Sequence, residues 1–358
     1  MRRIQDFGLG ILVEEPLRFF SFRLIDWKLQ VVIFYAMYAH CTHHKSQGSF
    51  LIIGRLVEFL SAPSAVQRSQ ISLGAGRVLD VAVAGPEDGT PLVFHHGTPN
   101  SLVLFEPFVE AAAARGLQYV SYSRPGYGNS TRQKGRTVAD CAKDTAGILD
   151  QLGADRFYSI GWSGGGPHAL ACAVLLPKRV IAASTVAGVA PYGSPNLDWL
   201  AGMGKENIEE MQAAVTGPNE LPTFIEREAP GFARVTGDQI IAALGDLVAD
   251  VDKAALSGQL GAFLADNTRE ALRNGFWGWF DDDIAFVRDW GFDFGLIKVP
   301  VTVWQGGKDR MVPFAHGRWL AEHLPGARAH LLAEHGHLSL AVGSFGKILD
   351  DLIASGKR

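Results

Sequence analysis

The segment Phe157-Tyr158-Ser159-Ile160-Gly161-Trp162-Ser163-Gly164-Gly165 decides how this chain is interpreted. Its first four residues are mostly apolar and predict a short strand, whereas residues 167–176 are rich in helix formers. Ser163 therefore stands at a strand-to-helix turn, the context in which G-x-S-x-G forms a nucleophile elbow. Gly161 and Gly165 remove Cβ atoms that would clash in so sharp a turn. The alternative, an incidental serine in a glycine-rich turn, is less favoured in this setting.

Composition bounds the class of protein. The chain has 358 residues, which is more than one compact core usually needs, so we expect one large domain with an insertion or appendage. A hydrophobic content of 47% with 20% charged residues is typical of a globular protein. The net charge of −4 gives no reason to expect nucleic-acid binding. The three cysteines are far apart and form no disulfide framework, which favours a reducing, cytoplasmic location.

From about residue 70, predicted strands and helices alternate. A hairpin of two strands comes first, and each later strand up to residue 186 is followed by a helix or a loop. This alternation predicts an α/β fold whose sheet is mostly parallel, with helices on both faces. The expected strands are 71–73, 77–83, 91–96, 119–122, 157–160, 180–186, 299–304 and 329–332, and the expected helices are 105–115, 137–152 and 167–176.

The alternation stops between residues 191 and 295. Helical patterns dominate there, such as 198–215 and 239–264, and four of the eight tryptophans lie in this stretch. A helical insertion between strands predicts a lid over the carboxyl edge of the sheet, where open α/β sheets place their sites. We therefore expect a core of residues 66–190 and 296–358 with a lid of residues 191–295. The charge run Asp281-Asp282-Asp283 is interpreted as a solvated face or a helix start.

Residues 1–65 are interpreted as an N-terminal helical extension of unclear role, or as the result of a start codon placed too far upstream. The apolar runs at 31–39 and 51–60 are too short to span a membrane, and no signal peptide is evident. Basic and aromatic residues interleave in this segment, so membrane contact through residues 1–60 stays open, although a clean amphipathic period is missing. The cluster His40, Cys41, His43 and His44 matches no zinc spacing and is interpreted as a loop.

A serine nucleophile needs a base and an orienting acid. In sheets of this type the order along the chain is serine, acid, histidine. Asp309 follows the strand at 299–304, and His337 follows a glycine after the last strand. These positions predict a Ser163-Asp309-His337 triad. Asp309 could instead be a turn aspartate, and His335 competes with His337, which the preceding glycine favours.

The anionic oxygen that forms during acyl transfer needs two hydrogen-bond donors. The backbone N–H of Gly164, next after the nucleophile, is the first expected donor. The second should come from the loop after His96, where Gly97 lets the backbone approach closely. Pro99 has no N–H, so Thr98 is the expected second donor.

Several stretches together resemble the α/β-hydrolase superfamily. The resemblance covers about residues 70–355, and the N-terminal extension has no counterpart in it. It implies an eight-stranded sheet, a lid after the sixth strand, no metal or organic cofactor, and the site residues named above. The matching stretches are His96-Gly97-Thr98-Pro99-Asn100-Ser101, Arg124-Pro125-Gly126-Tyr127-Gly128-Asn129-Ser130, Gly161-Trp162-Ser163-Gly164-Gly165-Gly166 and Gly336-His337.

Two features refine the resemblance. The family often has an aspartate before Arg-Pro-Gly, and Ser123 stands at that position here. The expected nucleophile is a serine, which argues against haloalkane dehalogenases and soluble epoxide hydrolases, relatives that attack through a carboxylate.

The leading functional hypothesis is hydrolysis of an ester or related acyl bond of a small, hydrophobic substrate. A proline iminopeptidase-like aminopeptidase is the alternative, with Glu226 and Glu228, or Glu209 and Glu210, to hold a free amine. Its usual oxyanion loop, His-Gly-Gly-Pro-Gly, is not found here. A carbon–carbon bond hydrolase, a cofactor-free perhydrolase and a non-enzymatic ligand-binding protein also stay open.

Overall fold

The computed structural model describes residues 66–256 and 258–357, and the predictions for residues 1–65 lie outside this part. Within it the chain forms an eight-stranded sheet of order β1-β2-β4-β3-β5-β6-β7-β8. β2 pairs antiparallel with β1 and β4, and the other pairs are parallel, so the predicted mostly parallel sheet is confirmed. The strands are β1 Gln67–Gly74, β2 Arg77–Ala84, β3 Thr90–His95, β4 Leu117–Tyr122, β5 Phe157–Trp162, β6 Val180–Val186, β7 Val301–Gly306 and β8 Arg328–Leu332.

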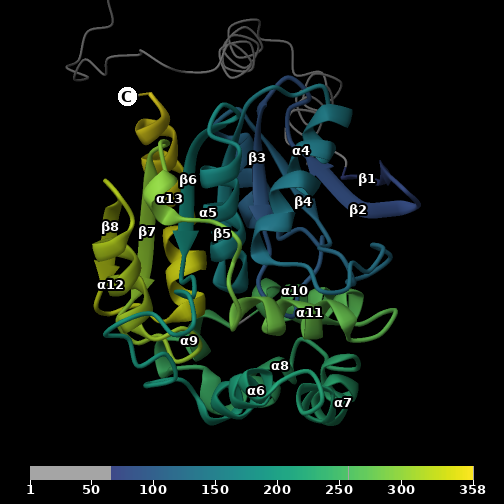
Figure 1. Cartoon of the computed structure of the whole chain (residues 1–358), viewed down its shortest axis with the longest axis vertical. Coiled ribbons are helices and arrows are strands. Elements are labelled where there is room, and N and C mark those ends of the chain that lie inside the picture. Colours follow the sequence, from purple (N-terminus) through teal and green to yellow (C-terminus); the bar gives the residue numbers. More distant parts are fainter. Residues whose placement is uncertain (1–65, 257, 358) are drawn as a thin grey trace, which may run out of the picture. The chain divides into compact units, whose positions relative to one another are not determined.

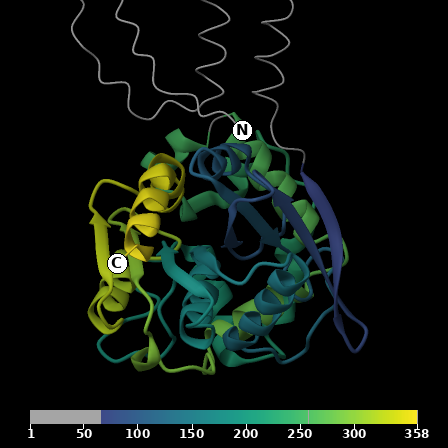
Figure 2. The ribbon, with the colours of Figure 1, turned by 90° about the horizontal axis from the view of Figure 1, so that it is seen from above.

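Helices cover both faces of this sheet because side chains alternate along its strands. In β3, Val93 contacts the hydrophobic cluster under one layer of helices, while Leu92 and Phe94 contact the cluster under the other. The first layer contains α4, α5 and α12, and the second contains α3 and α13 (Figures 1 and 2). These helices are α3 Glu106–Ala113, α4 Cys141–Gln151 with the short η1 Val138–Asp140, α5 Gly166–Leu175, α12 Phe314–His323 and α13 His337–Gly356.

Between β6 and β7 the chain forms a helical insertion, which gathers at one end of the sheet (Figure 1). The predicted helix at 198–215 is wrong at its start, because the regular helix begins only at Lys205. The predicted helix at 239–264 is interrupted at Gly245 and Gly258, whose φ angles of 49° and 66° no right-handed helix contains. The elements are α6 Lys205–Thr216, α7 Leu221–Phe232, α8 Ile240–Leu244, η3 Gly245–Leu247, α9 Asp250–Ala255, α10 Gln259–Ala271, α11 Trp277–Phe286 and η4 Phe294–Leu296.

The ends of the parallel strands bring distant parts of the sequence together. Ser163 directly follows β5, and Asp309 lies three residues after the end of β7. His337 begins α13 after β8, and His96 follows β3. Parallel strands place their carboxyl ends at one edge of the sheet, so these four residues share that edge. Among the described helices, none is long and apolar enough to cross a membrane.

Candidate active site

Ser163 sits on a strained turn. Its φ of 57° is unusual for a residue with a side chain, and it occurs at the first residue of η2 Ser163–Gly165. A Cβ on Gly161 would lie 2.0 Å from the Gly165 oxygen, and one on Gly165 would lie 1.9 Å from the His95 oxygen. Only glycine fits at these two positions. The sequence-based explanation of the G-x-S-x-G pattern therefore agrees with the geometry of the turn.

The loop after β3 lies against this turn. A Cβ on Gly97 would be 3.3 Å from the Ser163 Cβ, and one on Gly164 would be 2.6 Å from the Thr98 Oγ1. Thr98 and Gly164, the two predicted oxyanion donors, are thus brought together beside Ser163. Within the described part of the chain, the Thr98 N–H donates to no protein acceptor. The Gly164 N–H belongs to a first helical turn, where such groups lack intrahelical partners.

His96 holds the shape of that loop from within. The backbone N–H of Arg124 donates to His96 Nε2 at 3.2 Å, so Nδ1 carries the proton and donates to the Gly97 oxygen at 2.7 Å. Burial and the charge of Arg124 lower the pKa of His96 well below its usual value. His96 is therefore a neutral structural residue.

His337 and Asp309 form a buried pair. His337 Nδ1 lies 2.8 Å from Asp309 Oδ2, which leaves Nε2 as the imidazole nitrogen not engaged by the acid. The other carboxylate oxygen of Asp309 accepts from the N–H groups of Met311 and Val312, at 2.9 and 2.8 Å. Burial would lower the pKa of His337, but the charge and hydrogen bond of Asp309 outweigh it, and the pKa is raised. His335 makes no such contact with Asp309.

A second carboxylate, Asp252, acts on His337 from the helical insertion. Asp252 lies on α9, is fully buried, and accepts hydrogen bonds from the N–H groups of His337, Leu338 and Ser339 at 2.8 to 3.0 Å. These are the first N–H groups of α13, which a helix cannot satisfy itself. Asp252 therefore caps the helix that carries the histidine, and its charge also favours the protonated imidazole.

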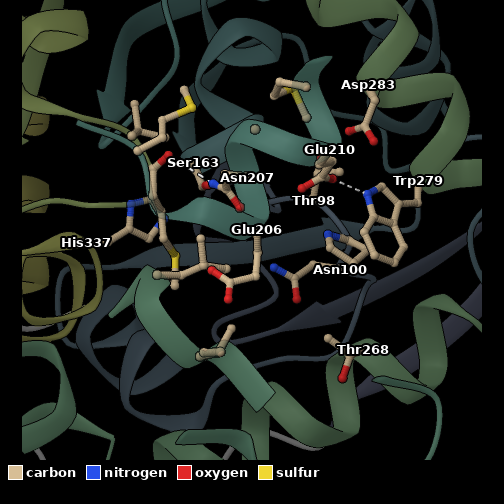
Figure 3. Close-up of a pocket in the computed structure, with 18 of the residues that line it drawn as sticks. Thr98, Asn100, Ser163, Glu206, Asn207, Glu210, Thr268, Trp279, Asp283 and His337 are labelled. Carbon is tan, nitrogen blue, oxygen red and sulfur yellow. Dashed lines mark hydrogen bonds between the residues drawn. The ribbon is translucent and has the colours of Figure 1, made fainter. Parts of the chain in front are cut away.

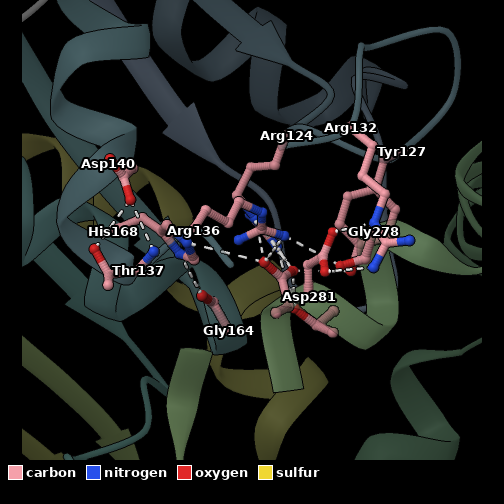
Figure 4. A network of polar contacts seen from close by, with 12 residues as sticks. Arg124, Tyr127, Arg132, Arg136, Thr137, Asp140, Gly164, His168, Gly278 and Asp281 are labelled. Carbon is pink, nitrogen blue, oxygen red and sulfur yellow. Dashed lines mark hydrogen bonds and ion pairs between the residues drawn. The ribbon is translucent and has the colours of Figure 1, made fainter. Parts of the chain in front are cut away.

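The acidic run at 281–283 is buried in the interior of α11, so its interpretation as a solvated face or a helix start is wrong. Asp281, Asp282 and Asp283 are 4%, 0% and 0% exposed. Asp282 accepts from Arg124 and from Arg136, both at 2.6 Å. Figure 4 shows these two arginines in the network of polar contacts. Their guanidinium groups compensate the charge and hold the pKa of Asp282 well below its usual range, despite its burial.

This network connects the insertion to the loop beside Ser163. Arg124 also donates to the backbone oxygens of His96 and Gly97, and Thr98 Oγ1 donates to Asp282 at 2.7 Å. The side chains of Arg124 and Thr98 are thereby fixed. These bonds hold the backbone of the loop in place, and the Thr98 N–H has no acceptor among the described residues.

Ser163 and His337 line one cavity of about 170 Å³, together with Thr98 and Gly164. Figure 3 shows His337 at one side of it and Trp279, Glu210 and Asp283 at the other. The lining is mainly apolar and comes largely from the insertion. Aromatic and methionine side chains that contribute are Trp162, Trp199, Phe224, Phe232, Trp279, Phe286, Met203, Met211 and Met311.

The glutamates predicted as alternative amine ligands divide into two groups. Glu210 and Glu228 line the cavity, whereas Glu209 and Glu226 do not. Two further acidic residues on the cavity wall, Glu206 and Asp283, were not predicted. Among the described residues, no group of three or more His, Cys, Asp or Glu side chains is arranged to hold a metal ion.

Comparison with known proteins places this geometry in a family. The sequence model of the alpha/beta hydrolase fold matches residues 90–344. An uncharacterized hydrolase of Bacillus subtilis is 25% identical over 271 residues, which are 74% of this chain and 89% of that protein. A non-heme chloroperoxidase of Streptomyces lividans is 28% identical over 234 residues, covering 64% and 78%.

The fold gives the same result. The crystal structure of a bromoperoxidase from Bacillus anthracis aligns with a TM-score of 0.59 at 22% identity, covering 80% of this chain and 100% of that one. The chain belongs to the alpha/beta hydrolase fold family, as its sequence motifs predict. The two relatives in sequence named above are a hydrolase and a chloroperoxidase, at 25% and 28% identity.

Proposed function

We propose that this protein hydrolyses a carboxylic ester or a related acyl bond through an acyl-Ser163 intermediate. The observation that carries the proposal is the shared cavity: the strained Ser163 lines it beside His337, whose imidazole is bonded to the buried Asp309. A serine hydroxyl is a weak nucleophile at neutral pH, and a neutral imidazole oriented by a carboxylate is the base that it needs.

In the first half of the reaction, His337 Nε2 takes the Ser163 proton while Oγ attacks the substrate carbonyl. The same proton then passes to the departing alcohol, and the acyl group stays on Ser163. In the second half, His337 takes a proton from water, the hydroxide attacks the acyl carbon, and the proton returns to Ser163 as the acid leaves. Asp309 keeps the proton of His337 on Nδ1 and stabilises the imidazolium.

The tetrahedral intermediates carry a negative oxygen, and the N–H groups of Thr98 and Gly164 are its proposed donors. Their position beside Ser163 supports this assignment. The positive end of α5 points toward the same region. Each donor of this kind contributes about a hundred- to a thousandfold to the rate.

The helical insertion is proposed to act as the lid that shapes the substrate pocket. Its apolar lining favours a small substrate with a hydrophobic acyl or alcohol group. The test is turnover of p-nitrophenyl esters of graded chain length, with rapid denaturation and mass spectrometry of the Ser163 peptide during turnover. A transient mass increase equal to the acyl group supports the proposal, and ester turnover without any acylated Ser163 contradicts it.

The pH dependence follows from His337. The base must be neutral, and its pKa is raised, so kcat/KM should increase with pH through a value above the usual histidine pKa of about 6.5. We expect Asp309→Asn to remove this stabilisation of the imidazolium and to lower kcat. Measurement of kcat/KM between pH 5 and 9 checks the expectation. An acid limb below the usual histidine value in the wild type would contradict it.

Asp252 is expected to be a positioning residue for His337. Asp252→Asn removes the charge that favours the imidazolium, so the acid limb of kcat/KM should move to lower pH. It also weakens the cap of α13, and kcat should fall about tenfold through misplacement of the imidazole. The matched control is Asp250→Asn on the same helix, whose carboxylate is exposed and forms an ion pair with the exposed Lys253. Equal pH profiles for the two variants would exclude the role.

A further inference from the structure

Two carboxyl groups face the cavity on the side away from His337 (Figure 3). Glu210 comes from α6 and Asp283 from α11, so both belong to the helical insertion. The described residues that line the cavity include two more carboxylates, Glu206 and Glu228, but no lysine or arginine. The cavity is therefore an apolar space with an acidic wall, and that wall has no role in the proposed acyl transfer.

Asp283 is the unusual member of this wall. It is fully buried, and no N–H or hydroxyl donor in the described part of the protein reaches either of its carboxyl oxygens. Burial without hydrogen bonds is costly for a carboxylate, by several kcal/mol in general. Folded proteins rarely leave such a group unpaired unless a ligand or a shared proton satisfies it.

Glu210 is the neighbour that shares this proton. One of its oxygens accepts from the Trp279 indole N–H, and its other polar partner is the carboxyl group of Asp283. Burial raises the pKa of Glu210 to about 7, and burial together with the nearby Glu210 charge raises the pKa of Asp283 well above its usual value. Above about pH 7 the pair therefore holds one proton and carries one negative charge.

The surrounding charges leave this pair uncompensated. Arg136 is the cation that acts on Asp283, and it already donates to Asp282, which is itself negative. Glu228 is paired with the exposed Arg227 at 2.6 Å. The remaining negative charge of Glu210 and Asp283 therefore faces the cavity.

We propose that Glu210 and Asp283 form a subsite for a protonated amine carried by an otherwise apolar substrate. An alkylammonium has three N–H donors, and once the shared proton has left, the pair offers three carboxyl oxygens that no N–H or hydroxyl group of the described residues occupies. Binding of the ammonium group displaces the shared proton into solvent. The net charge of the subsite therefore stays the same, because the cation takes the place of the proton. The subsite deepens the proposed function by naming an amino-acyl or amino-alkyl ester as substrate, and the ester chemistry rests on that function.

Binding tests the subsite without turnover. Calorimetry on the full chain compares hexylamine with hexan-1-ol, which has the same apolar body and no charge. We expect the wild type and the Ser163→Ala variant to bind hexylamine at least about tenfold more tightly than hexan-1-ol. The alcohol has no charge and cannot form the desolvated ion pair. Glu210→Gln and Asp283→Asn should abolish this preference. The control Glu206→Gln, an exposed carboxylate on the same wall, should keep it.

A proton count distinguishes a subsite from a structural role. At about pH 8, above the pKa of about 7 of Glu210, titrations in two buffers of different ionisation enthalpy should show that hexylamine binding to the wild type releases close to one proton. Asp283→Asn, which removes the carboxyl group that keeps the proton, should release almost none. Thermal melting checks folding, and Asp283→Asn should melt no lower than the wild type because it removes an unpaired buried carboxyl. The proposal is overturned if hexan-1-ol binds as tightly as hexylamine. It is also overturned if Glu206→Gln loses the preference for hexylamine to the same extent as the two subsite variants.

Turnover separates the two proposals. Ethyl 6-aminohexanoate is compared with ethyl hexanoate, and phenylalanine ethyl ester with ethyl 3-phenylpropanoate, in the wild type and in both subsite variants. A preference for one amino ester that disappears in the variants supports the subsite. Hydrolysis of the plain esters with no amine preference supports the proposed function and overturns the subsite. Amine binding without any Ser163-dependent hydrolysis supports the subsite and overturns the proposed function.

Discussion

Replacement of Ser163 by alanine is expected to reduce ester hydrolysis by at least about a thousandfold. The variant keeps the cavity and the His337–Asp309 pair, so substrate binding should persist while no acyl-enzyme forms. The expected residual rate comes from the oxyanion donors and from binding alone. Turnover of a p-nitrophenyl ester and labelling by a fluorophosphonate probe measure the effect.

The control for this experiment is Ser69→Ala. Ser69 is exposed on β1 and does not line the cavity of Ser163, so its replacement should leave both turnover and labelling unchanged. Fluorophosphonate labelling that persists in Ser163→Ala, on an intact fold by circular dichroism, would place the nucleophile at another residue.

Replacement of Asp282 by asparagine is expected to destabilise the protein by about 3 to 5 kcal/mol, the usual cost of removing one partner of a buried ion pair. Arg124 and Arg136 are 1% and 3% exposed and would be left as buried charges. The loop of His96 to Thr98 depends on the same arginine, so activity should fall together with stability. Denaturant unfolding measures the free-energy change.

The neighbouring Asp281 offers a matched control. It forms a paired hydrogen bond with Arg132, whose side chain is 21% exposed and lies over the Trp277 ring. Asp281→Asn should therefore cost less, on the order of 1 kcal/mol, because solvent can compensate the freed arginine. If Asp282→Asn loses no more stability than Asp281→Asn, the central role of Asp282 in the network is wrong.

Local patterns predicted the parts of this molecule that depend on local geometry. The strand-to-helix turn at Ser163 needs glycine at positions 161 and 165, and the five-residue G-x-S-x-G motif indicates this requirement directly. The alternation of strands and helices predicted the sheet because each strand must bury both faces. The His337–Asp309 contact followed from the order of residues after strand ends, which is a property of the topology.

Partners that are distant in sequence were the residues that local patterns could not predict. Asp282 meets Arg124 158 positions away, and Asp252 meets His337 85 positions away. A run of three aspartates is usually solvated. Here Asp282 is buried because Arg124 and Arg136, which are distant in sequence, compensate its charge. The breaks at Gly245 and Gly258 were also missed, since a glycine within a helical pattern is often tolerated.

The cap that Asp252 places on α13 limits how the two parts of this protein can diverge. The core carries the histidine, but the acceptor for the first N–H groups of that histidine's helix is encoded about 85 residues upstream, in the insertion. A core from which residues 187–300 were deleted would retain Ser163, Asp309 and His337 and would still lack that acceptor. We expect exchange of the insertion with that of a relative to preserve the proposed reaction only if the new segment supplies a carboxylate at the position of Asp252. We therefore expect any change of the insertion to affect both the specificity of the pocket and the function of His337 as a base.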